Sequence, residues 1–74
     1  MINFNIEQPV LYRGVETNQL KQNHIYHGKL IESNHGGYIF ETSFDYTENK
    51  ESSAFIIFSS ATMVERYLTT EGIK

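Results

Sequence analysis

Residues 24–44 read HIYHGKLIESNHGGYIFETSF, and this stretch contains the strongest hairpin signal in the chain. Its centre, residues 34–37, is Asn-His-Gly-Gly, a run of residues that tolerate the positive φ angles of tight turns. We therefore expect an antiparallel pair of strands, one over residues 24–32 and the other over residues 38–44.

The two strands of this hairpin differ in how regularly their apolar side chains alternate. In the strand after the turn, one face should belong to the core: Tyr38, Phe40, Thr42 and Phe44. The opposite face, which includes Glu41, should be exposed. The strand before the turn has no clean apolar face, and Gly28 lies within it, where glycine often marks a β-bulge or the close approach of another backbone. We expect that strand to bend strongly.

Two extended segments are expected before the hairpin. Apolar residues alternate with asparagine over residues 2–7, which predicts a first strand with one buried face. Pro9 has no amide hydrogen and cannot lie inside a paired central strand, so the chain should break or cross a sheet edge there. A second segment, residues 10–16, then places Val10 and Tyr12 on one face.

A strand and a helix are expected after the hairpin. Residues 45–52 form a polar, acidic loop, and residues 53–59 contain the most apolar run of the chain. Because both faces of that run are apolar, it should be a central strand covered on both sides. Ser59 and Ser60 then offer N-cap oxygens to a short helix over residues 61–68, whose apolar side chains fall on one stripe.

The segment that leads into the hairpin carries a family resemblance. Residues 17–23 are polar apart from Leu20, which indicates a surface turn anchored by one buried side chain, with Asn23 in a left-handed conformation. The stretch from Leu20 to Gly28, LKQNHIYHG, resembles the turn and second strand of small SH3-like barrels found in bacteria and their phages. In those barrels a leucine, a basic residue and a glycine lead into a strand that bears tyrosine. The resemblance implies a barrel and a binding role.

The order of these elements predicts a single domain over residues 1–74 with an α+β, mostly β fold. We expect either a small antiparallel curled sheet or an SH3-like barrel of about five strands, with one short C-terminal helix. The chain has no cysteine, and no apolar run approaches the ~20 residues of a membrane span. The start of the sequence lacks the pattern of a signal peptide, so we expect a cytoplasmic protein with no membrane contact.

The composition argues against several classes of function. The net charge is −3 and the six Lys and Arg residues are scattered, so nucleic-acid binding is unlikely. His24 and His27 point to opposite faces of an extended strand and cannot bind one ion, and His35 is read as a turn residue, so no metal site is expected. No nucleophile motif or phosphate loop occurs. We therefore expect no enzymatic activity and no cofactor.

One group of residues remains as a candidate partner-binding site. Acidic side chains surround the loop after the hairpin, and a tyrosine lies at its centre: Glu41, Asp45, Tyr46, Glu48 and Glu51. A merely solvated loop is the ordinary interpretation of such a cluster. In the functional interpretation, these residues contact a basic surface on a partner protein.

The sequence thus favours a small, non-enzymatic protein-binding module. Its size and its richness in Ile and Asn are typical of accessory proteins from AT-rich phage or bacterial genomes, so we expect a phage- or mobile-element-encoded inhibitor or modulator that binds one host protein through the 45–52 loop and a sheet edge. Two alternatives stay open. One is a nucleic-acid-associated small β-barrel, since strand aromatics can stack on bases. The other is a homo-oligomeric structural accessory protein, for example a homodimer through a sheet edge at the first strand or at the strand after Pro9.

Overall fold

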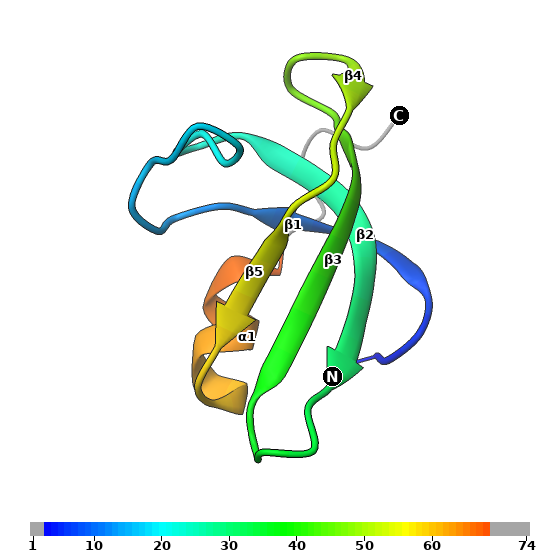
Figure 1. Ribbon diagram of the computed structural model, residues 1–74, viewed down its shortest axis with the longest axis vertical. Helices are drawn as coiled ribbons and strands as arrows, with labels where there is room; N and C mark the ends of the chain where they lie inside the picture. Colours follow the sequence, from blue (N-terminus) through cyan, green and yellow to red (C-terminus); the bar gives the residue numbers. More distant parts are fainter. Residues whose placement is uncertain (1–2, 69–74) are drawn as a thin grey trace.

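The structure, a computed structural model, describes residues 3–68. Five strands and one helix follow one another in this range: β1 (Glu7–Leu11), β2 (Ile25–Glu32), β3 (Tyr38–Asp45), β4 (Lys50–Glu51), β5 (Phe55–Phe58) and α1 (Ala61–Tyr67) (Figure 1). The strands form one antiparallel sheet in which β2 lies between β1 and β3, and both β4 and β5 pair with the far side of β3. The sheet is curled and does not close. The mostly β fold and the C-terminal helix are confirmed, and of the two expected architectures the curled sheet is the one formed.

The β2–β3 hairpin is confirmed, together with its turn. Gly36 has a φ of 87°, in the left-handed region that favours glycine. The backbone N–H of Ser33 donates to the carbonyl of Gly37 at 2.8 Å, and the N–H of Gly36 donates back to the carbonyl of Ser33 at 3.2 Å. These bonds close the turn and fix the register of the two longest strands.

The bulge expected at Gly28 is present, and its extra residue lies on the opposite strand. His27 is paired with Phe44 and Gly28 with Thr42, so Ser43 has no counterpart on β2. The two backbones are so close here that a Cβ atom on Gly28 would collide with the carbonyl oxygen of Glu41. The extra residue shifts the alternation of β3 by one.

This shift corrects one expectation about the core face of β3. Phe40 and Thr42 are buried, as predicted, and Tyr38 packs partly buried against the core. Phe44 is only half-buried, and Asp45 takes the inward position with a relative exposure of 2%. A polar carboxyl group therefore lies where the unbroken alternation predicted an aromatic ring.

The strand predicted at residues 2–7 is wrong over most of its length. Residues 3–6 form no strand, since Asn5 has a φ of 62° and turns the chain before β1 begins at Glu7; residue 2 lies outside the described residues. Pro9 does not break the chain but lies within β1, paired with His27. It is tolerated there because β1 is an edge strand, so Pro9 needs no second set of ladder hydrogen bonds.

The second segment is also shorter than predicted, because β1 ends at Leu11. Val10 and Tyr12 are nevertheless both buried, so the predicted shared face is confirmed. The turn over residues 17–23 is confirmed as well, with Leu20 buried and Asn23 at a φ of 67°.

Two buried tyrosines attach this turn to the core. The Tyr12 hydroxyl donates to the carbonyl of Val15 at 2.7 Å, and the Tyr26 hydroxyl accepts from the N–H of Lys21 at 2.6 Å. Burial raises the pKa of both phenols above the usual value of 10.0.

The helix α1 covers the concave face of the sheet (Figure 1). The hydroxyl of Ser60 caps it by accepting from the N–H of Met63 at 3.2 Å, as predicted. Val64 and Tyr67 are buried, and the Tyr67 ring meets the Phe58 ring edge-on at 4.8 Å. Beyond the helix, Leu68 forms an isolated bridge with Val10, which brings the end of the described chain against β1.

The expectation of a central strand at residues 53–59 is wrong. β5 covers only Phe55–Phe58 and, within the described residues, pairs with β3 alone. Ile56 and Phe58 point into the core, whereas Phe55 and Ile57 are 62% and 63% exposed. The helix covers one face of this apolar run, and no described element covers the other.

The contact at Gly28 yields a stability prediction. Gly28→Ala should lower the free energy of unfolding by about 3 kcal/mol, because a backbone carbonyl on β3 must move to admit the new Cβ. Gly36→Ala is the matched control, since its Cβ meets no atom within 4 Å and only its positive φ opposes the change; it should cost about 1 kcal/mol. Urea unfolding measures both, and equal losses would contradict the role given to Gly28.

Candidate functional site

The acidic residues proposed from the sequence do not form one uniform surface. Glu41, Glu48 and Glu51 are exposed, but Asp45 is buried. Asp45 Oδ2 lies 3.0 Å from His24 Nδ1, and Asp45 Oδ1 accepts from the backbone N–H of Glu48 at 3.0 Å. The Asp45 carboxylate is thus bound inside the protein and positions the turn between β3 and β4.

Tyr46 and Thr47 attach the same turn to the start of β2. The Tyr46 ring stacks on the His27 ring, with centroids 5.4 Å apart and planes at 22°. The N–H of Tyr46 donates to the carbonyl of Ile25 at 2.8 Å, and Thr47 Oγ1 accepts from the N–H of Ile25, also at 2.8 Å. Glu48 therefore projects from an anchored turn and not from a loose loop.

An apolar surface that the sequence did not reveal lies on the outer side of the sheet. Register places Ile39 beside Ile57 and Glu41 beside Phe55. We call these four residues of β3 and β5 the β5 face. Its two β5 members are the most exposed large apolar side chains in any strand of the described chain. Of the five residues proposed from the sequence, Glu41 is the one that belongs to this face.

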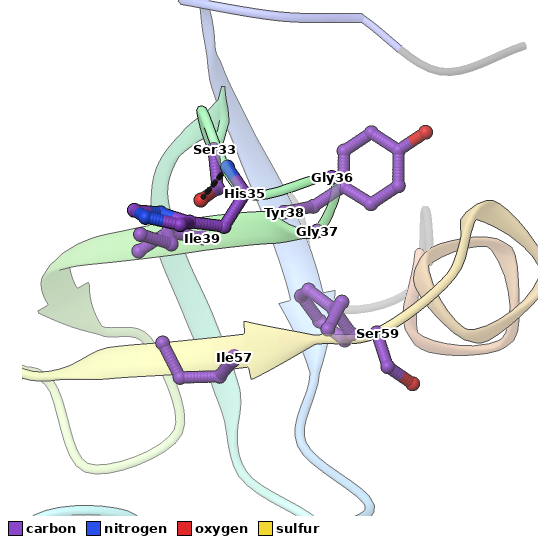
Figure 2. Close-up of a pocket in the computed structure, with 9 residues that line it drawn as sticks. Ser33, His35, Gly36, Gly37, Tyr38, Ile39, Ile57 and Ser59 are labelled. Atoms are coloured by element: carbon purple, nitrogen blue, oxygen red, sulfur yellow. Dashed lines mark hydrogen bonds between the residues drawn. The ribbon is translucent and has the colours of Figure 1, made fainter.

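A pocket of about 340 Å³ extends the β5 face toward the β2–β3 turn. His35 and Ile39 line it on the side of the turn and β3, and Ile57 and Ser59 line it from β5 (Figure 2). The N–H of His35 donates to Ser33 Oγ at 3.1 Å, which holds the turn above the pocket. The pocket is open to solvent and mostly apolar, so it suits an apolar side chain.

The three histidines have separate surroundings. His24 pairs with Asp45, His27 stacks on Tyr46, and His35 lies in the hairpin turn. His27 Nε2 is buried and has no hydrogen-bond partner among the described residues. No group of three or more potential metal ligands lies together within residues 3–68. In the same range, no helix is long and apolar enough to cross a membrane.

The structure predicts unequal effects for the carboxylates of this region. Asp45→Ala should lower the free energy of unfolding by about 2 kcal/mol, because it leaves the N–H of Glu48 and the ring of His24 without the carboxylate that they contact. Glu48→Ala and Glu51→Ala should each change it by less than about 0.5 kcal/mol, since both side chains are exposed. Chemical denaturation compares the three variants. Similar losses for all three would show that Asp45 does not hold the turn.

Comparison with known proteins adds no relative to this description. No protein-family model matches the chain, and no curated protein and no solved structure matches it.

Proposed function

We propose that this protein is a small, non-enzymatic protein-binding module that uses the β5 face to bind a partner with a basic surface. One observation carries the proposal: Phe55 and Ile57 lie two residues apart on one face of an edge strand, and each exposes more than half of its surface. Contiguous apolar side chains left in water mark interaction sites more often than isolated ones.

Charge around the β5 face supports a basic partner. Glu41 lies beside Phe55, with the exposed Lys29 of β2 on its other side, and Glu51 lies on β4, which pairs with the same edge of β3 as β5. Lys50 is the only cation between Glu41 and Glu51 in the sequence. An apolar centre with a charged rim is the usual anatomy of an interface, and a negative rim steers a positive partner toward it.

The other classes of function receive less support. The titratable side chains that line the pocket are His35 and Tyr38, which is a poor basis for acid–base catalysis in an open, apolar cavity. Of the four aromatic residues considered for base stacking, Tyr12, Tyr26 and Phe40 are buried in the core, and Tyr38 is partly buried against it. Protein binding is therefore favoured over nucleic-acid binding.

A finer form of the proposal concerns the biological setting. We propose a cytoplasmic inhibitor or modulator encoded by a phage or mobile element, acting on one host protein. Small size and richness in Ile and Asn support this setting by association with such accessory proteins.

The test is affinity capture with the tagged protein from a bacterial lysate, with nuclease added, followed by mass spectrometry and measurement of the Kd for the purified partner. The double variant Phe55→Ser and Ile57→Ser should weaken binding at least about tenfold, because both side chains would lie at the centre of the interface. Its free energy of unfolding should change little, since both side chains are exposed. Val15→Ser, at a loop residue that is 82% exposed, is the matched control and should bind like the wild type.

Three outcomes would contradict the proposal. Equal Kd values for the double variant and the Val15 control would move the site away from the β5 face. Recovery that disappears on nuclease treatment would favour the nucleic-acid alternative. Recovery of no stoichiometric protein would remove the binding function.

A further inference from the structure

We propose that the free edge of β5 binds an extended segment of the partner as an additional strand of the sheet, with apolar residues at alternate positions and lysine or arginine near its end. This inference rests on the proposed function and specifies how the β5 face binds. Strand addition uses backbone hydrogen bonds for affinity and alternate side chains for specificity.

Contacts with β3 at both ends of β5 show which of its backbone groups point outward. The carbonyl of Ala54, just before β5, accepts from the N–H of Thr42 at 2.9 Å, so the polar groups of Ala54 face β3. The carbonyl of Phe58 also faces β3, because a Cβ atom built on Gly37 would lie 2.9 Å from it. Backbone groups of successive strand residues alternate in direction, so those of Phe55 and Ile57 point away from β3.

These outward groups are open for pairing. Between residues 3 and 68, no backbone hydrogen bond outside the sheet ladders involves Phe55 or Ile57. In the view of Figure 1 the neighbouring helix α1 lies behind β5. Two N–H donors and two carbonyl acceptors thus form a short template for another strand.

The side chains of the same two residues set the pattern of the added segment. A neighbouring strand places its directly opposite side chains about 5 Å away, so residues on its outer face would contact Phe55 and Ile57. Apolar residues at alternate positions would bury these rings and methyl groups. The pocket beside Ile57 and Ser59 offers space for one more apolar side chain at that end of the strand.

Charge sets the composition at the other end. Glu41 lies next to Phe55 in register, and Glu51 and Glu48 come just before β5 in the chain. Glu41, which is exposed and lies beside Phe55, is the carboxylate that a lysine or arginine at the Phe55 end of the segment would pair with. The segment is therefore basic and apolar, and an acidic one would be repelled.

The opposite edge of the sheet does not offer the same template. On β1, Pro9 has no N–H to donate, and Leu68 already bridges to Val10. A second copy of this chain is also a poor occupant of the β5 edge. β5 has four residues, so a symmetric pair would bury little beyond its two exposed side chains per copy, well short of the roughly 1,200 Å² of a stable interface. Two copies would also bring together surfaces of the same charge.

The experiment uses the isotope-labelled protein and a defined probe, a nine-residue peptide in which alternating valine and threonine are flanked by two lysines at each end. NMR titration should move the amide resonances of Phe55 and Ile57 and slow their hydrogen exchange at least about tenfold. The same peptide with glutamates in place of the lysines should bind at least about fivefold more weakly at low salt. No change at Phe55 and Ile57, or equal affinity for both peptides, would overturn the inference.

Variants at one position separate backbone pairing from side-chain contact. Ile57→Pro removes an outward N–H and leaves the β3–β5 ladder intact, so the protein should stay folded but bind the lysine peptide at least about tenfold more weakly than wild type. Ile57→Ala keeps that N–H and should lose only about threefold. Continued protection of the Ile56 and Phe58 amides checks the fold, and Phe55→Pro, whose N–H also points outward, serves if the first variant unfolds.

The outcomes keep this inference distinct from the proposed function. If Ile57→Pro and Ile57→Ala bind equally, side chains alone make the contact, and strand addition is wrong although the β5 face still binds a protein. Sedimentation of the protein without peptide tests the remaining alternative, which is self-association through the β5 edge. A dimer that Ile57→Pro dissociates would assign the edge to a second copy and overturn the partner segment.

Discussion

The close approach of β2 and β3 at Gly28 is the contact on which the rest of the structure depends. A side chain at this position would meet the Glu41 carbonyl, so glycine allows the two backbones to cross near Thr42 at the distance that the bulge requires. A bulge increases the local twist, and the sheet curls into the concave surface that α1 fills. The extra residue, Ser43, also turns Asp45 inward, where its carboxylate binds His24 and the turn to β4.

The same curl explains why one side of β5 is left in water. A single helix of seven residues can cover the concave face of the sheet, and it does so over Ile56 and Phe58. A chain of 74 residues has no second layer for the convex side among the described elements. Phe55 and Ile57 are exposed because no described element covers the convex side of β5.

Features of the fold that are set by neighbouring residues could be predicted from the sequence. Features that depend on packing between distant segments could not. The hairpin turn, the left-handed Asn23 and the Ser60 cap follow from residues that act on their immediate neighbours. The candidate site was harder to predict from the sequence. Glu41 was identified, but the burial of Asp45 depends on which of the two strands carries the extra residue of the bulge. Likewise, the apolar run of β5 has the same pattern whether one or both of its faces are covered, so periodicity alone could not reveal its exposed side.

The two edges of the sheet differ in how they are protected against pairing with another strand. An unpaired edge with apolar side chains invites self-association, and β1 avoids it through Pro9 and the bridge from Leu68. β5 has neither protection, but Glu41 and the carboxylates that precede β5 surround its exposed end. Like charge on two copies opposes their pairing through this edge, whereas the same carboxylates attract a basic segment. Under the proposed function, one set of side chains thus opposes pairing between two copies and favours a basic segment.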